Sequence, residues 1–278
     1  MPRFVLVACG DEHVRKANLA VRALKRFTRT PILVVAARHT TRVQHDEVIE
    51  FEPPPEMTDV QASRYMKTGL AEIIGRLDDV HCYLDNDVLC VSPEAERIFD
   101  LRRGPINFTP DHQSNLWQHA RTAMKTPVPR GGGPQLQLAL RERFNVDIDA
   151  HWRLWNGGVF LFDEASRRFL DTWHRYTCLL FNDPQLHPRD QGALAATVWT
   201  LGLQNEPLLP IDCNWIMGCT LGYHYKLSYE DGCFKYREHR PKFLHFICDR
   251  IDRWEYRQVL EMLNNEHPAV AETSPCLR

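Results

Sequence analysis

Two aspartates, Asp85 and Asp87, stand one residue apart in HCYLDNDVLCVSP, a stretch whose other residues are typical of a buried strand. Because side chains alternate along a strand, we expect both carboxylates on one face and Asn86 on the other. Two like charges about 4 Å apart, at an effective dielectric of about 20, repel by about 4 kcal/mol. A positive group should therefore lie between the two carboxylates.

A divalent cation would meet this need. Mg²⁺ and Mn²⁺ prefer carboxylate oxygens and commonly share their coordination shell with substrate phosphates. The alternative is an Asx turn that closes the strand, for which a single aspartate suffices. The pair Asp85 and Asp87 therefore favours a metal site.

The stretches RLWNGGVFLFD and RDQGAL supply further candidates. Gly157 and Gly158 lack the Cβ that would hold a ligand away from the backbone. A β-bulge explains these glycines equally well, but it leaves the preceding Asn156 unexplained. Asp190 and Gln191 open a predicted helix, of which Asp190 could be the N-cap. A capping carboxylate at the rim of a cleft still presents an oxygen, so both interpretations of Asp190 can hold.

Three further charged or titratable side chains stand on predicted helices and strands. Arg64 and Lys67 lie about one helical turn apart in SRYMKTGLAEIIGRL, so both can reach one ligand, although such charges more often form a solvated face. Lys67 borders the apolar stripe of this helix. His245 is an isolated histidine in the apolar stretch KFLHFICD, where a satisfied core residue is an equal alternative.

The elements that must position these residues alternate between strand and helix. In the first half, strands are predicted at 3–10, 31–37, 47–53 and 80–84, and helices at 11–27 and 63–77. Strands that are apolar on both faces indicate a mostly parallel sheet between helices. Ligands of such sheets collect at the carboxyl ends of the strands, where Asp85 and Asp87 stand.

The second half is less regular. A Pro- and Gly-rich segment at 126–135 is a candidate mobile flap. Strands are then predicted at 153–163 and 242–249, and helices at 164–181, 190–201 and 251–263. We expect one domain over residues 1–265 and a polar, disordered tail at 266–278.

Composition excludes several classes of protein. Lys and Arg number 34 against 36 for Asp and Glu, so there is no basic field and we do not expect nucleic acid as a partner. The nine cysteines contain no Cys-x-x-Cys, which argues against a zinc ribbon and a disulfide scaffold and favours a reduced cytosol. Apolar runs are too short to span a bilayer and no secretory leader is recognised, so we expect a cytoplasmic protein without a transmembrane segment.

The order of YLDNDVL, WNGGVFLFD, RDQGAL and FLHF resembles the order of signatures in GT-A glycosyltransferases related to glycosyltransferase family 8, such as glycogenin and lipopolysaccharide galactosyltransferases. The resemblance extends from Val5 to about Trp254 and rests on the order of the motifs, since none is specific alone. It implies an α/β fold of the GT-A, Rossmann-like type, with a mostly parallel central sheet flanked by helices and a smaller region on the acceptor side.

In that family the Asp-x-Asp carboxylates and a late histidine bind Mn²⁺, or Mg²⁺, which bridges the diphosphate of a nucleotide sugar. The resemblance therefore implies Asp85, Asp87 and His245 as metal ligands. The family usually continues after this histidine with a glycine and a Lys-Pro-Trp, whereas HFICDRIDRW stands here. Arg250 or Arg253 is then the candidate for the diphosphate.

The resemblance also assigns residues to the nucleotide sugar. ACGDEH matches the segment that binds base and ribose, and Asp190 and Gln191 would lie beneath the reacting carbon as catalytic residues. The set expected to bind the nucleotide sugar is Ala8, Cys9, Asp11, Arg64, Lys67, Asn86, Asn156, Gly157 and Gly158. For ACGDEH a capped helix start is the alternative.

The function implied is metal-dependent transfer of a hexose, with retention, from a nucleotide diphosphate, UDP first among them, to a glycan, lipid-linked or protein acceptor. Two alternatives stay open. Phosphatases of the haloacid dehalogenase type also carry Asp-x-Asp after an apolar strand, although normally on the first strand, as nucleophile and general acid. A transferase-like module without turnover would fit the missing glycine and lysine after His245.

Overall fold

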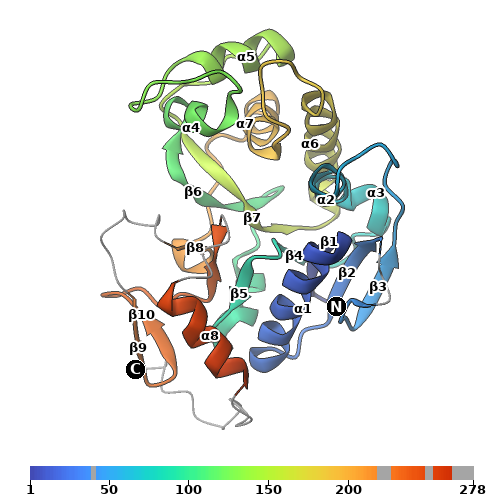
Figure 1. The fold of residues 1–278 in the computed structure, drawn as a ribbon, viewed down its shortest axis with the longest axis vertical. Helices are drawn as coiled ribbons and strands as arrows, with labels where there is room; N and C mark the ends of the chain where they lie inside the picture. Colours follow the sequence, from blue (N-terminus) through green and yellow to red (C-terminus); the bar gives the residue numbers. More distant parts are fainter. Residues whose placement is uncertain (39–41, 218–226, 248–252, 265–278) are drawn as a thin grey trace.

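A six-stranded sheet in the order β3-β2-β1-β4-β7-β6 forms the centre of the molecule (Figure 1). The computed structural model describes residues 1–38, 42–217, 227–247 and 253–264. β1 pairs in parallel with β2 and β4, and β2 with β3, whereas β7 runs antiparallel to β4 and β6. The predicted mostly parallel sheet is confirmed. The strands are β1 (Arg3–Cys9), β2 (Ile32–Ala37), β3 (Glu47–Glu50), β4 (His81–Leu84), β6 (Asn107–Asn115) and β7 (Arg153–Phe162).

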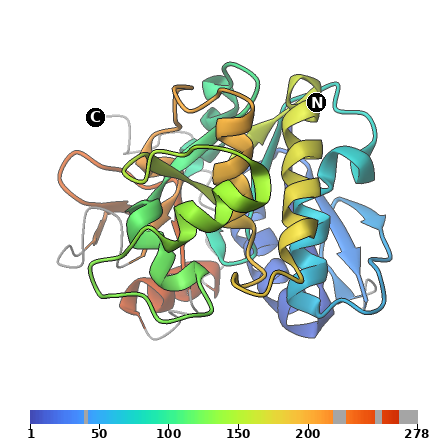
Figure 2. The same ribbon diagram turned by 90° about the horizontal axis from the view of Figure 1, so that it is seen from above.

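Helices cover both faces of this sheet, as the two ribbon views show (Figures 1 and 2). Alternate residues of β1 point to opposite sides: Phe4 and Leu6 join a core with α1 and α8, and Val5 and Val7 join a second core with α2, α6 and α7. The helices are α1 (Gly10–Phe27), α2 (Asp59–Thr68), α3 (Leu70–Ile74), α4 (Leu116–Ala123), α5 (Gln135–Phe144), α6 (Arg167–Leu180), α7 (Asp190–Thr200) and α8 (Trp254–Asn264).

A small second sheet, in the order β5-β11-β8, lies beside the large one. Its strands are β5 (Val88–Cys90), β8 (Trp215–Ile216) and β11 (Phe243–His245), and a separate hairpin joins β9 (Ser228–Glu230) to β10 (Cys233–Lys235). Within the described residues, 3-10 helices lie at Pro93–Leu101, Glu164–Ser166 and Ile211–Cys213. Strands of two or three residues are too short to show a period, so sequence patterning missed β8, β9 and β10, while β5 lies in the stretch HCYLDNDVLCVSP that was interpreted as one strand with β4.

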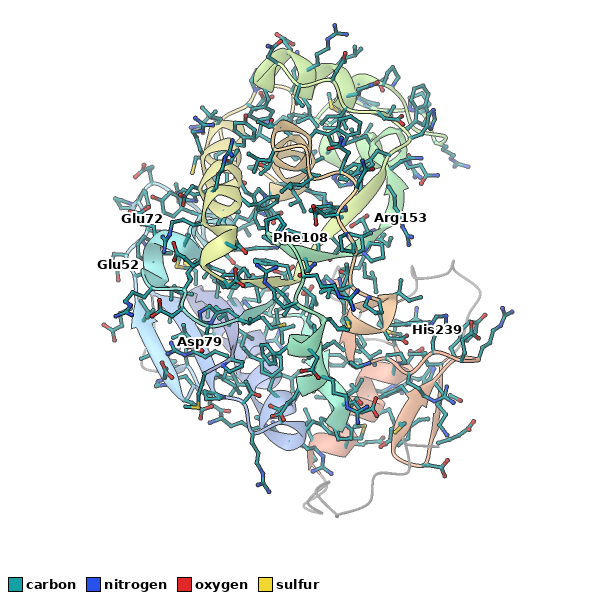
Figure 3. All side chains as sticks on the ribbon, turned by 180° about the vertical axis from the view of Figure 1, so that it is seen from behind. Glu52, Glu72, Asp79, Phe108, Arg153 and His239 are labelled. Atoms are coloured by element: carbon teal, nitrogen blue, oxygen red, sulfur yellow. The ribbon has the colours of Figure 1, made fainter. Side chains whose placement is uncertain are left out.

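Aromatic rings fill the core between the large sheet and α6. Figure 3 shows Phe108 at the middle of the molecule, and its ring lies 4.9 Å from that of Phe160 and 5.7 Å from that of Trp173. Trp155 and Phe169 complete the cluster at 5.5 and 5.6 Å from Phe108. Aromatic rings at such spacing stabilise beyond their buried area, so this core holds β6 and β7 firmly against α6.

The helix predicted at 63–77 is two helices. α2 begins earlier, because Thr58 and Gln61 form a capping box in which each side chain bonds the backbone N–H of the other. α2 then ends where Gly69 N–H donates to the Tyr65 carbonyl. A Cβ on Gly69 would lie 3.2 Å from Cε1 of His174 in α6, so the break also permits close helix packing. Of the strand predicted at 242–249, β11 keeps only Phe243–His245.

Cysteine chemistry and membrane segments test two further expectations. Cys233 is disulfide-bonded, which a reduced cytosol would not favour, while Cys9, Cys82, Cys90 and Cys213 are buried free thiols. Within the ranges that the structure describes, no helix combines the length and the apolar character needed to cross a bilayer. The tail predicted at 266–278 and Arg250 lie outside the described residues.

His81 in β4 gives a prediction on acid stability. Neither of its ring nitrogens has a hydrogen-bond partner, and burial, with the charge of Arg3, lowers its pKa to about 4. Between this value and the unfolded pKa of about 6.5, only the unfolded chain binds the proton, so stability falls as the pH falls. The wild type should therefore lose free energy of unfolding between pH 7.5 and 5, and we expect His81→Leu to reduce this loss by about 2 kcal/mol.

Urea unfolding of wild type and His81→Leu at both pH values measures this difference. His45→Gln, at an exposed histidine, is the control and should keep the pH dependence of wild type. An equal loss of stability in wild type and His81→Leu would contradict the prediction.

Candidate active site

Asp85, Asn86 and Asp87 form a turn that links the large sheet to the small one. Val88 N–H closes the turn by donating to the Asp85 carbonyl (3.0 Å). The expectation that both aspartates alternate along one strand is therefore wrong, because the strand ends at Leu84. The turn, rather than strand alternation, sets the directions of the two carboxylates.

Pairing of the small sheet brings His245 to this turn. Val88 of β5 is the register partner of His245 in β11, and Phe246 N–H donates to the Asp87 carbonyl (2.9 Å). One ligand atom each from Asp85, Asp87 and His245 lies within 4.8 Å of the others. The structure thus gathers the three residues predicted to bind a metal.

The imidazole of His245 and the carboxylate of Asp87 stabilise each other's charge. His245 Nε2 lies 3.2 Å from Asp87 Oδ1; the imidazole is buried and the carboxylate is half-buried. Burial raises the pKa of Asp87, but the facing His245 outweighs it and the net pKa is lowered. Burial likewise lowers the pKa of His245, and the Asp87 charge reverses this to a raised value.

Lys67 is the positive group that faces the other aspartate. Its Nζ lies 3.1 Å from Asp85 Oδ1 and 2.9 Å from Asp190 Oδ2. Burial lowers the pKa of this amine, but the charges of Asp190 and Asp85 outweigh burial and raise it. Burial raises the pKa of Asp190, and Lys67 lowers it to a net value below normal. The site therefore holds a fixed ammonium between two carboxylates.

Aromatic rings surround this ammonium. Lys67 Nζ lies 5.2 Å from the ring centre of Tyr83 and 5.8 Å from that of Trp173, within cation–π range. The Tyr83 hydroxyl donates to Asp85 Oδ1 (2.7 Å), and the Trp173 indole donates to the Asp190 carbonyl (3.2 Å). These contacts hold Lys67, Asp85 and Asp190 in one arrangement.

A polar cavity of about 230 Å³ opens over these charges. It runs between α1 and α2, with the turn at its floor. Its predicted members are Arg64, Lys67, Asp85, Asn86, Asp87 and Asp190. Sequence reasoning missed His13, Lys16, Val60, Ser63 and Tyr83, which also line it. His13 and Lys16 stand three residues apart, as Arg64 and Lys67 do, so both pairs can lie on one face of a helix. This spacing is the sequence signal by which His13 and Lys16 could have been found.

The residues nominated from ACGDEH do not line this cavity. Ala8 and Cys9 are buried in β1, and the exposed Asp11 forms an ion pair with Arg42 (2.9 Å). A Cβ on Gly10 would overlap Asp59. Their role in binding a nucleotide stays a prediction.

Asn156, Gly157 and Gly158 lie behind the metal candidates, in the middle of β7. Asn156 Oδ1 accepts from Gly158 N–H (2.8 Å), and Asn156 Nδ2 donates to Asp111 Oδ2 (2.8 Å). Gly157 packs against Lys67 and Gly158 against His245, where a Cβ would lie 3.2 Å from Nζ and 2.5 Å from Cε1 respectively. In the described structure the glycines therefore make room for protein side chains of the site.

Asp190 is the first residue of α7 and not its N-cap, so that alternative for Asp190 is wrong, and its carboxylate is bound to Lys67. The helix follows Arg189 as its N-cap residue. Gln191 turns inward and its amide donates to the Trp155 carbonyl. Asp190 alone of this pair lines the cavity described above.

The set of two carboxylates and one imidazole suits Mn²⁺ or Mg²⁺, for which oxygen ligands with a single nitrogen are acceptable. Beside it, the single ammonium of Lys67 offsets part of the negative charge of Asp85 and Asp190. Such a site can bind a cation at the turn, and the cavity beside it also contains Lys16 and Arg64, whose positive charges can attract an anionic ligand.

Comparison with solved structures places this fold among glycosyltransferases. Galactosyltransferase LgtC, solved with donor and acceptor sugar analogues, matches with a TM-score of 0.60 and 13% identity over 94% of this chain and 95% of LgtC. The apo bifunctional glycosyltransferase WbbM matches with a TM-score of 0.60 and 14% identity over 94% of this chain, which spans 49% of WbbM. Mouse xyloside xylosyltransferase 1, also apo, gives 0.51 and 14% over 89% of this chain and 98% of that protein.

The chain therefore has the GT-A fold of glycosyltransferases that resemble family 8. At these identities the likeness concerns the fold. No protein-family model and no curated protein sequence matches the chain.

Lys67 gives a prediction on stability. Removing one partner from a buried ion pair leaves an uncompensated charge, so Lys67→Met should lower the free energy of unfolding by about 3 kcal/mol at pH 7. Adding Asp190→Asn should recover part of this loss, since it removes one unpaired carboxylate. Urea unfolding of the four proteins in this double-mutant cycle measures the coupling.

Arg76→Met, which breaks the exposed pair of Arg76 with Asp78, is the matched control and should change stability by less than about 0.5 kcal/mol. If Lys67→Met and Arg76→Met lowered the free energy of unfolding equally, Lys67 would not be needed to stabilise the charges of Asp85 and Asp190.

Gly158 gives a prediction on packing. Gly158→Ala puts a methyl group 2.5 Å from Cε1 of His245, so His245 or β7 must shift, and stability should fall by about 1–3 kcal/mol. Gly192→Ala is the control, because its Cβ would meet Leu140 at an ordinary 3.5 Å and alanine favours the helix α7. Thermal unfolding compares the two variants; a Gly158→Ala protein as stable as Gly192→Ala would refute the crowding argument.

Proposed function

We propose that the protein is a metal-dependent glycosyltransferase that moves a hexose from a UDP-sugar to a hydroxyl acceptor with retention at the anomeric carbon. One observation carries the proposal: in a GT-A fold, Asp85, Asp87 and His245 meet at the end of β4, beside a cavity that contains Lys67 and Asp190. The acceptor would be a glycan, a lipid-linked sugar or a protein.

Asp85, Asp87 and His245 would hold the metal, Mn²⁺ or Mg²⁺. When bound there, the cation would act as a Lewis acid that neutralises the charge on the departing diphosphate. The raised pKa of His245 and the lowered pKa of Asp87, each caused mainly by the other after burial is overcome, support a site already arranged for one positive charge.

The cations near the cavity would hold the rest of the diphosphate. Arg253 is committed to the buried Glu255, whose two carboxylate oxygens it meets at 3.2 Å each. Lys16 and Arg64 both line the cavity, so we assign the phosphates to them instead of Arg253. His13 at the same cavity offers a flat ring for the base, and the backbone at Ala8, Cys9 and Asp11 stays a proposal for base and ribose.

Asp190 would stabilise the reacting carbon electrostatically. Its lowered pKa, which Lys67 imposes against the effect of burial, keeps the carboxylate ionised, and a fixed negative charge favours positive charge that develops in a transition state. Gln191, Asn156, Gly157 and Gly158 stay candidates for the sugar side. Gln191 and Asn156 already have protein partners, so we assign them to shaping the site first.

The two other candidate functions have less support. A phosphatase of the haloacid dehalogenase type would need its aspartates on the first strand, but Asp85 and Asp87 follow β4. A module without turnover would keep the cavity yet need no ionised Asp190 held by Lys67. Both are outcomes of the experiment below.

A thermal-shift series with Mn²⁺ and UDP, GDP or ADP tests the donor and the metal. UDP at a hundred times its dissociation constant should stabilise the wild type by about 2.7 kcal/mol, or roughly 5–10 °C. The shift should require Mn²⁺ and should vanish in Asp87→Asn. Asp78→Asn, at an exposed aspartate before β4, is the control and should keep the full shift.

Release of UDP from UDP-hexoses, with and without acceptor sugars, then separates the functions. Transfer or slow hydrolysis that needs Asp190 supports the glycosyltransferase. UDP binding without turnover would favour the inactive module, and a covalent aspartyl-phosphate would favour the phosphatase.

A further inference from the structure

Asn214 is a buried amide that the sequence did not suggest, only 2% exposed and placed just before β8. β8 and β11 pair in parallel, with Trp215 opposite Leu244 and Ile216 opposite His245. This register brings the Asn214 side chain against the face of His245 that points away from Asp87. Asn214 Oδ1 lies 3.0 Å from His245 Nδ1.

The donors and acceptors in the hydrogen-bond chain around Asn214 can be assigned in only one way, and the assignment starts from a backbone N–H. Gly158 N–H can only donate, and its partner 2.8 Å away is the Asn156 amide, so that atom must be the carbonyl oxygen Oδ1. The other atom, Nδ2, then donates to the Asp111 carboxylate (2.8 Å). Both ends therefore agree on the orientation of Asn156.

The orientation of Asn156 determines that of Asn214. The Asn156 oxygen also lies 2.8 Å from the Asn214 amide, so the atom that Asn214 presents must be the donor Nδ2. The same Nδ2 donates to Thr109 Oγ1 (2.8 Å). The remaining atom of Asn214 is its oxygen, and an oxygen beside His245 Nδ1 can only accept.

We propose that Asn214 is a positioning residue that keeps the proton of His245 on Nδ1, so that the lone pair of Nε2 would be free for the cation that Asp85, Asp87 and His245 would hold. The inference deepens the proposed function and rests on it. In a neutral imidazole one nitrogen carries the proton and the other accepts, so the partner of the first nitrogen selects the metal-binding one. Partners of this kind commonly change metal affinity 10–100-fold when removed.

The role of Asn214 differs from simple core packing in what it predicts. An oxygen at the same place is what His245 needs, whereas the two donor bonds to Asn156 and Thr109 serve the fold. Asn214→Asp keeps the oxygen and replaces the donor by a second oxygen that faces Asn156. It should therefore lose stability and keep metal affinity, while Asn214→Leu should lose both.

Titration with Mn²⁺, followed by electron paramagnetic resonance of the free ion, measures the affinity without any sugar substrate. We expect Asn214→Leu to bind Mn²⁺ 10–100-fold more weakly than wild type, and Asn214→Asp to stay within about threefold. Asn107→Leu is the matched control, because Asn107 is equally buried at the far end of the β6–β7 pair and should lose stability alone. Asn214→Ser, too short to reach Nδ1, replaces the leucine variant if that protein does not fold.

The inference would be overturned if Asn214→Leu or Asn214→Ser bound Mn²⁺ with wild-type affinity. It would also be overturned if Asn214→Asp bound Mn²⁺ as weakly as those two variants are expected to. His245→Gln separates this failure from that of the proposed function. If wild type binds no Mn²⁺, or His245→Gln binds it as wild type does, the metal site itself is wrong and both proposals fall. If His245→Gln is weak and Asn214→Leu is not, the metal site stands and only the positioning role is lost.

Discussion

Compensation of the half-buried negative charge at the turn of Asp85 and Asp87 is the constraint on which the rest of the site depends. Two carboxylates at the end of β4 need positive partners, and each receives its own: Lys67 from α2 and His245 from β11. Because the partners come from different elements, α2 and the small sheet must both close on this turn. The charge balance thereby ties the two sheets and one helix together.

The junction of the two sheets then explains the polar core behind the site. The turn leaves the large sheet at β4 and enters the small sheet at β5, where Val88 is the register partner of His245. Its second nitrogen faces the interior, where an unsatisfied polar atom would be costly. Asn214, Asn156 and Thr109 fill this space with bonds of defined direction.

Much of the fold was readable because burial on both faces imposes long apolar runs. β1, β2 and β7 are such runs, and α1, α6 and α7 fall close to their predicted ranges. β6 was not readable, since NFTPDHQSN contains proline and polar residues and becomes a strand through pairing with β7. β11 lies within the strand predicted at 242–249, whereas β8 has two residues and becomes a strand only through its pairing with β11.

The sequence by itself determined which residues carry charge, where the parallel strands end and the order of motifs that resembles GT-A glycosyltransferases. It placed Lys67 and Asp190 on the right helices but not in contact, and it put Asp85 and Asp87 at the end of β4, although on a strand where the structure has a turn. Tertiary structure alone decided that Lys67 bridges Asp85 and Asp190, that Gly157 and Gly158 make room for Lys67 and His245, and that Asn214 faces His245. The physical reason is that local spacing governs periodicity, whereas pairs such as Lys67 with Asp190 depend on how sheets and helices pack across long stretches of chain.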